Sequence, residues 1–132
     1  MYSYALVDLY AETSALVGLC DSNPGRLESR MAFSRQHGAQ PRGYPADRFE
    51  QMIAETQPEA VIVTTVDRYH DDYICRGMEL GCDVITEKPM TTDAEKCQRI
   101  IDTQRRTGRS LKVTFNYRYS PPRTQVKDLL MS

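Results

Sequence analysis

The stretch Ala60-Val61-Ile62-Val63-Thr64-Thr65 is an unbroken run of apolar and β-branched residues, and it is the strongest strand pattern in the chain. A run without polar alternation is typical of a strand buried on both faces, as in a parallel sheet. Apolar residues at helical spacing flank it, which predicts one helix that ends before Pro58 and another from Tyr69 to Leu80. A strand between two helices indicates an α/β fold.

The same alternation extends along the rest of the chain. Further strands are expected at 15–20, 83–86 and 111–115, with at most a very short one near Tyr44. The remaining helices are expected at 2–10, 24–37, 92–107 and from about 122 onward. The expected cap is Ser22 or Asn23 for the helix at 24–37 and Asp47 for the helix that ends before Pro58. A capping box formed by Thr92 and Glu95 is expected for the helix at 92–107. We therefore expect a doubly wound parallel sheet with right-handed crossovers.

Length and charge exclude several classes of protein. With 132 residues, 40% of them hydrophobic and 27% charged, the chain has room for one globular domain. Its 17 Lys and Arg residues against 18 Asp and Glu residues leave no basic surplus for nucleic acid or an anionic membrane. No apolar run approaches the roughly 20 residues that span a bilayer, and the first residues lack the pattern of a signal peptide.

The four cysteines lie in apolar segments and include no C-x-x-C pair; they are Cys20, Cys75, Cys82 and Cys97. A disulfide framework or a zinc site would need closer spacing. We therefore expect reduced thiols, no metal site and a cytoplasmic location.

Ligands bind at the carboxyl ends of the strands in open α/β sheets, so the polar residues after each expected strand are the candidates. Asp21 follows the strand at 15–20. A carboxylate there can accept hydrogen bonds from the 2′- and 3′-hydroxyls of a ribose and repel a 2′-phosphate. It can equally cap the next helix, as Ser22 or Asn23 also could. These two roles remain open at the level of sequence.

Lys88 follows the strand at 83–86 and precedes Pro89, which excludes the lysine from the helical region and presents it toward the strand ends. The alternative is a surface lysine in an ordinary strand-to-helix turn. His70 could donate to a ligand or cap a helix, whereas His37 is expected at the negative end of a helix dipole. Arg118 could bind an anion or pack flat on a neighbouring tyrosine.

Taken in order, these segments resemble a known family. D-S-N-P-G-R at 21–26, V-I-V-T-T-V-D-R-Y-H at 61–70, E-K-P at 87–89 and F-N-Y-R-Y-S-P-P at 115–122 are similar to the nucleotide-binding half of the glucose–fructose oxidoreductase, inositol dehydrogenase and MocA family. The resemblance implies a Rossmann domain for NAD or NADP, followed by an α+β domain that binds a sugar or cyclitol. It also implies hydride transfer between a substrate carbinol carbon and the nicotinamide.

The resemblance assigns roles by position. It implies that Asp21 holds the adenosine ribose, that Arg26 lies near the adenine or its phosphate, and that NAD is the cofactor, with NADP possible. The other cofactor contacts that it implies come from Thr64, Thr65, His70, Glu87, Lys88 and Pro89. Lys88 would also be the catalytic residue, because it would polarise the substrate hydroxyl and stabilise the developing alkoxide. Asn116 and Arg118 would border the substrate side.

The family's G-x-G-x-x-G loop and the strand before it should precede the first helix, yet none of the seven glycines stands in that arrangement. Residues 1–132 are therefore expected to form an incomplete NAD(P)-binding Rossmann domain without the substrate domain. The absent strand should lie between the strands at 15–20 and 60–65. We expect these residues alone to lack dehydrogenase activity, to bind NAD poorly and to self-associate as a homo-oligomer.

Two functions from other classes compete with this one. A non-catalytic interaction or sensor module on a degenerate Rossmann scaffold would keep the fold without its chemistry. A phosphorelay receiver domain would use Thr65 and Lys88-Pro89 in its phosphorylation pocket. It also needs an acceptor aspartate at the end of a strand, which residues 39–45 do not supply.

Overall fold

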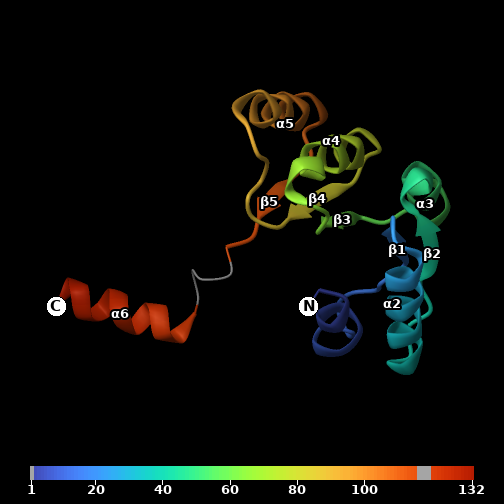
Figure 1. Cartoon of the computed structure of the whole chain (residues 1–132), viewed down its shortest axis with the longest axis horizontal. Helices are drawn as coiled ribbons and strands as arrows, with labels where there is room; N and C mark the ends of the chain where they lie inside the picture. The colour runs from blue at the N-terminus through green and yellow to red at the C-terminus, as the bar shows by residue number, and fades with distance from the viewer. Residues whose placement is uncertain (1, 116–119) are drawn as a thin grey trace. The chain divides into compact units, whose positions relative to one another are not determined.

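The computed structural model describes residues 2–115 and 120–132. The chain forms two compact units, Met1–Glu59 and Ala60–Ser132. Each unit contains a parallel sheet with helices between its strands, as the ribbon in Figure 1 shows. The α/β class expected from the apolar runs is therefore confirmed.

The N-terminal unit is built around two strands. Its elements are α1 (Tyr2–Tyr4), the π-helical turn η1 (Ala5–Leu9), β1 (Gly18–Asp21), α2 (Pro24–Gln36), β2 (Arg42–Pro45), the 3-10 turn η2 (Ala46–Arg48) and α3 (Phe49–Thr56). β1 and β2 pair in parallel, with Gly18 opposite Arg42 and Asp21 opposite Pro45. The strand expected at 15–20 thus begins later, at Gly18, because the partner strand described for it begins at Arg42.

Two glycines show that helices cover both faces of the β1–β2 pair. A Cβ at Gly18 would lie 3.0 Å from a side-chain carbon of Met52 in α3, whereas a Cβ at Gly43 would lie 3.3 Å from the sulfur of Met31 in α2. Gly43 is opposite Leu19 in the register, so it points to the other face of the sheet from Gly18. The pair is therefore doubly wound, as predicted.

The C-terminal unit has a three-stranded sheet. Its elements are β3 (Ala60–Val63), the 3-10 turn η3 (Asp67–Tyr69), α4 (His70–Glu79), β4 (Asp83–Thr86), α5 (Ala94–Thr107), β5 (Leu111–Val113) and α6 (Pro121–Met131). The strand order is β3-β4-β5, all parallel, and Val63, Thr86 and Val113 are level with one another. The loops after these strands therefore start side by side.

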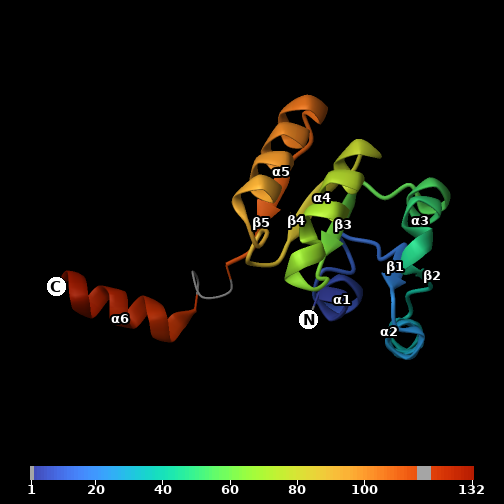
Figure 2. The same ribbon diagram turned by 45° about the horizontal axis from the view of Figure 1, so that its top comes forward.

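The core of this unit lies between α4, α5 and one face of the sheet. α4 packs against β3 and β4, and α5 lies beside α4 in both views (Figures 1 and 2). Ile74 and Ile100 are fully enclosed, and Val84 is almost so. Gly77 allows the close approach of α4, because a Cβ there would lie only 3.2 Å from a methyl group of Val84.

Two predicted helix caps are wrong. Asp47 lies within the turn η2, so α3 begins after Arg48 without a side-chain cap. α5 is capped by Asp93, whose carboxylate accepts a hydrogen bond of 2.9 Å from the backbone N–H of Lys96, and not by Thr92. Asp93 has the extended backbone that a cap requires, and its short side chain reaches the third N–H of the helix. The cap predicted at Asn23 is confirmed.

The strands form two sheets, of two and three strands, where the sequence predicted one. Each unit contains one of the two sheets. Among the described residues, no helix has the length and apolarity needed to cross a membrane.

The packing of α5 predicts the effect of a single truncation. Ile100→Ala should lower the free energy of unfolding by about 2–5 kcal/mol, because it leaves a cavity at a fully enclosed site. The measurement is urea unfolding at one protein concentration. Leu130→Ala is the control, since Leu130 is 81% exposed and its truncation should change stability by no more than about 0.5 kcal/mol. Equal losses in both variants would contradict the described core.

Candidate functional site

Polar side chains follow the strands at their carboxyl ends in both units. In the N-terminal unit, Asp21 ends β1 and is joined to Arg26. In the C-terminal unit, the segment after β3 and the segment after β4 meet at His70. The structure therefore brings the predicted site residues together in two groups, one in each unit.

Asp21 is held by Arg26 through two parallel hydrogen bonds. The Arg26 Nε donates to Oδ2 at 2.9 Å and Nη2 donates to Oδ1 at 2.7 Å. Oδ1 also accepts a hydrogen bond of 2.7 Å from the backbone N–H of Asn23. The cap of α2 is Asn23 itself, whose side chain accepts from the N–H of Arg26. Asp21 is therefore not the cap of α2, which was one of the two roles that the sequence left open for it.

This pairing sets the charge at the end of β1. The hydrogen bonds from Arg26 hold the pKa of the Asp21 carboxyl below its ordinary value, against the opposing effect of partial burial. The Asp21 side chain is 28% exposed and that of Arg26 is 64% exposed. The pair therefore presents an ionised carboxylate and a guanidinium at the surface, and the two can recognise hydroxyl groups or an anion.

His70 begins α4 and joins the loops that follow β3 and β4. Its side chain is almost fully enclosed, with 1% exposure. Nδ1 lies 2.8 Å from the carbonyl oxygen of Pro89, and Nε2 lies 3.0 Å from that of Thr65. Both ring nitrogens are thus engaged by backbone, and His70 belongs to the site as the group that connects its loops.

The residues around this histidine are more exposed. Thr64 and Thr65 are exposed beyond the end of β3, and so is Lys88 beyond β4. The backbone N–H of Glu87 donates to the carbonyl of Val63 at 3.2 Å, which extends the hydrogen bonding between β3 and β4 by one residue. A Glu87 carboxylate oxygen accepts from the N–H of Lys88 at 3.3 Å, and the Lys88–Pro89 peptide bond is cis. The lysine ammonium is therefore carried on a loop that backbone contacts hold.

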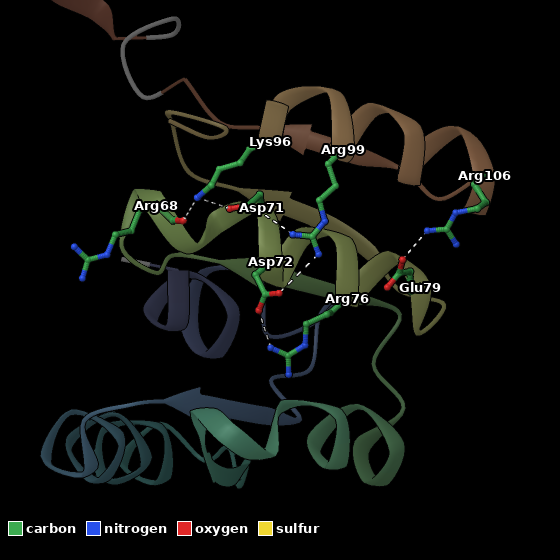
Figure 3. A network of polar contacts seen from close by, with 8 residues as sticks. All are labelled: Arg68, Asp71, Asp72, Arg76, Glu79, Lys96, Arg99 and Arg106. Atoms are coloured by element: carbon green, nitrogen blue, oxygen red, sulfur yellow. Dashed lines mark hydrogen bonds and ion pairs between the residues drawn. The ribbon is translucent and has the colours of Figure 1, made fainter. Parts of the chain in front are cut away.

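A network of ion pairs between α4 and α5 lies next to these loops (Figure 3). The Asp71 side chain is 6% exposed and is bound by Lys96 and Arg99, each at 3.1 Å. Asp72 accepts from Arg76 at 2.9 Å. A buried carboxylate needs such partners, because an unpaired charge in the interior is strongly destabilising.

Lys96 links this network to the loop after β3. Its ammonium also donates to the backbone carbonyl of Arg68 in the turn η3. This contact was not predicted from the sequence. The ion pairs with Asp71, in contrast, could have been indicated by the spacing of Lys96 and Arg99, which places both on one face of a helix, together with two acidic residues in the first turn of α4.

Other candidate features lie elsewhere or are not described. A hollow of about 280 Å³ lined by Leu6, Leu16 and His37, among others, lies at the amino end of β1 and so away from Asp21. Within residues 2–115 and 120–132, no three His, Cys, Asp or Glu side chains gather closely enough to hold a metal ion. Asn116 and Arg118, predicted on the substrate side, lie outside the described residues.

Comparison with known proteins agrees with the α/β fold of this chain. The sequence pattern of an oxidoreductase family with an NAD-binding Rossmann fold matches residues 4–115. D-glucoside 3-dehydrogenase of Escherichia coli is 28% identical over 113 residues, which are 86% of this chain and 30% of that protein. Inositol 2-dehydrogenase/D-chiro-inositol 3-dehydrogenase of Lactiplantibacillus plantarum is 26% identical over 116 residues, which are 87% of this chain and 32% of that protein.

A solved structure extends the likeness to three dimensions. The WlbA dehydrogenase from Bordetella pertussis, crystallised with NADH and UDP-GlcNAcA, has a TM-score of 0.80 and 25% sequence identity. The match covers 98% of this chain and 38% of the WlbA chain. The chain thus spans less than two fifths of the length of each of these proteins.

The Asp21–Arg26 pair makes a prediction about pH. Because folding lowers the pKa of Asp21, the pair stabilises the protein above the ordinary carboxyl pKa of about 4 and is lost as the pH falls through the folded value. Arg26→Gln should raise the pKa of Asp21 toward its ordinary value, as measured by carboxyl ¹³C NMR.

Arg35→Gln is the matched control, since Arg35 pairs with Glu28 on the same helix at 3.4 Å. It should leave the Asp21 titration unchanged. If Arg26→Gln also left it unchanged, the two hydrogen bonds would not be the cause of the lowered pKa.

Proposed function

Because this chain belongs to the oxidoreductase family with an NAD-binding Rossmann fold, we propose that it is the nucleotide-binding part of an NAD-dependent oxidoreductase acting on a sugar- or cyclitol-like alcohol. One observation carries the proposal: polar segments follow β1, β3 and β4 at their carboxyl ends, where open α/β sheets bind ligands. The names of the relatives, a D-glucoside 3-dehydrogenase and an inositol dehydrogenase, support the substrate class.

The carboxylate of Asp21 fits an adenosine ribose. Three hydrogen bonds from Arg26 and Asn23 reach it, whereas an ionised carboxylate has about four acceptor sites, so a ribose hydroxyl can still donate to it. Arg26 lies beside it and can face the adenine or a phosphate. We assign the remaining cofactor contacts to Thr64, Thr65, Glu87, Lys88 and Pro89, with His70 acting through the two carbonyls that it binds.

The chemistry requires one further group from this chain. NAD, when bound, accepts or returns the hydride. Lys88 is exposed at the carboxyl end of β4, so its ammonium can donate a hydrogen bond to the substrate hydroxyl and stabilise negative charge on that oxygen. Asn116 and Arg118 would border the substrate. Lys88 is therefore the catalytic residue of the proposal.

The comparisons bear differently on the two alternative functions. The family match argues against the phosphorelay receiver. A non-catalytic sensor module would share the fold and differ in chemistry, and the cofactor experiment below separates it from an oxidoreductase. We further infer a cytoplasmic homo-oligomer. The location rests on the four cysteines, all within the described part of the chain, none of which forms a disulfide. The oligomer rests on β3, which pairs only with β4 among the described strands.

Cofactor preference tests the proposal. A 2′-phosphate near Asp21 would place like charges close together, at a cost of roughly 1–4 kcal/mol. Pairing with Arg26 reduces this repulsion, so we expect a preference for NAD over NADP of about 10-fold, near 1.4 kcal/mol. Asp21→Ser should abolish the preference, because it removes the repulsion and releases the guanidinium to bind the phosphate.

The measurement is kcat/KM for both cofactors. It uses a fusion in which a relative supplies the glycine-rich loop and the substrate domain. Asp47→Ser is the control, because Asp47 is exposed and lies in the turn η2. Equal use of NAD and NADP by the wild type would show that Asp21 does not select the cofactor. A wild type without any cofactor-dependent activity would favour the sensor module.

A further inference from the structure

The enclosed imidazole of His70 spans two loops that are far apart in the sequence. It contacts the carbonyl of Thr65, five residues before it, and that of Pro89, nineteen residues after it. Both distances, 3.0 and 2.8 Å, are those of good hydrogen bonds. Carbonyl oxygens only accept, so a neutral imidazole donates to one of them at a time and an imidazolium donates to both.

The two carbonyls lie next to the residues that the proposed function requires. Thr65 is itself one of the exposed threonines after β3, and Pro89 directly follows Lys88. Because Val63 and Thr86 are level in the sheet, the two loops leave adjacent strands at the same height. The His70 side chain therefore bonds to both the loop that carries the threonines and the loop that carries the lysine.

Two further bonds hold the ends of these loops. The N–H of Glu87 donates to the carbonyl of Val63, which fixes the start of the second loop. Lys96 donates to the carbonyl of Arg68, which fixes the end of the first loop from the side of α5. Between these two points, His70 bonds to both loops.

We propose that His70 is a positioning residue that couples Lys88 to the Thr64–Thr65 segment through its two ring nitrogens. This inference rests on the proposed function, because it concerns the cofactor and substrate sides of the same site. Nε2 positions the threonine loop, which faces the cofactor. Nδ1 positions the loop of Lys88, which faces the reacting hydroxyl. The two bonds should therefore affect different kinetic constants.

Two amide substitutions separate the two bonds. In His70→Asn the side-chain N–H₂ can take the place of Nδ1, so it retains the bond to Pro89 and loses the bond to Thr65. In His70→Gln the N–H₂ can take the place of Nε2, so it retains the bond to Thr65 and loses the bond to Pro89. His70→Leu loses both bonds. General destabilisation would affect the two amide variants alike, whereas positioning predicts opposite patterns.

The first test uses the 132-residue chain and needs no activity. The carbonyl ¹³C signal of Thr65 should shift in His70→Asn, that of Pro89 in His70→Gln, and both in His70→Leu. The wild type provides an independent measurement, in which at least one ring N–H of enclosed His70 should be protected from exchange with water. The exposed His37, the only other histidine, should show no such protection.

The second test measures kinetics in the fusion described above. His70→Asn should raise the KM for NAD about 10-fold with a smaller change in kcat, because it frees the threonine loop. His70→Gln should lower kcat about 10- to 100-fold with a smaller change in KM, because it displaces Lys88. His37→Asn and His37→Gln are the matched controls and should change neither constant.

The outcomes distinguish this inference from the proposed function. If His70→Leu moves only one carbonyl signal or none, or if the ring N–H of wild-type His70 exchanges as fast as that of His37, the coupling is overturned. The same changes in kcat and in KM in both amide variants would also overturn it. Crossed carbonyl shifts in the 132-residue chain, together with a fusion that neither binds nor uses NAD, would support the two bonds and contradict the proposed function alone.

Discussion

The carbonyls of Thr65 and Pro89 share one enclosed imidazole, and the candidate site in the C-terminal unit is organised around this contact. The parallel register brings the ends of β3 and β4 level, so their loops leave the sheet as neighbours. His70 then joins the loops and begins α4. The same helix carries Asp71, whose pairs with Lys96 and Arg99 hold α4 against α5. Backbone pairing, one imidazole and one buried carboxylate thus act on the same short segment.

The end of β1 follows a different principle, in which charge matters more than burial. Asp21 is ionised and partly exposed, and its charge is shared with Arg26. An isolated carboxylate would repel a phosphate strongly, whereas a paired one repels it less and leaves a guanidinium nearby. Cofactor choice in the proposed function is therefore a balance between these two side chains.

Much of the fold could be predicted from local patterns. The apolar run at 60–65 predicted β3, which ends at Val63. The helices before and after it end close to the expected positions, at Thr56 and Glu79. The helix caps were harder, because Thr92 and Asp93 are adjacent residues that can both cap, and only the backbone angles of Asp93 separate them. The late start of β1 depends on its partner strand, which no local pattern reveals.

The candidate site was predictable in position and less so in its contacts. The carboxyl ends of parallel strands indicated Asp21, Thr65 and Lys88. The partners of His70 were not predictable, because backbone carbonyls carry no sequence pattern and one of them lies nineteen residues away. The contact between Lys96 and Arg68 likewise joins residues 28 apart in the sequence, and it exists only because α4 and α5 pack together.

The central claim is that the loops at the carboxyl ends of the strands bind the dinucleotide. The direct measurement is an NMR titration of the ¹⁵N-labelled chain with NAD at concentrations up to millimolar. We expect weak binding, with amide shifts confined to residues 21–26, 64–66 and 87–88. The amides of Leu16 and His37, which line the hollow at the other end of β1, should not move. Shifts centred on that hollow, or no shifts at millimolar NAD, would show that these loops do not bind the dinucleotide.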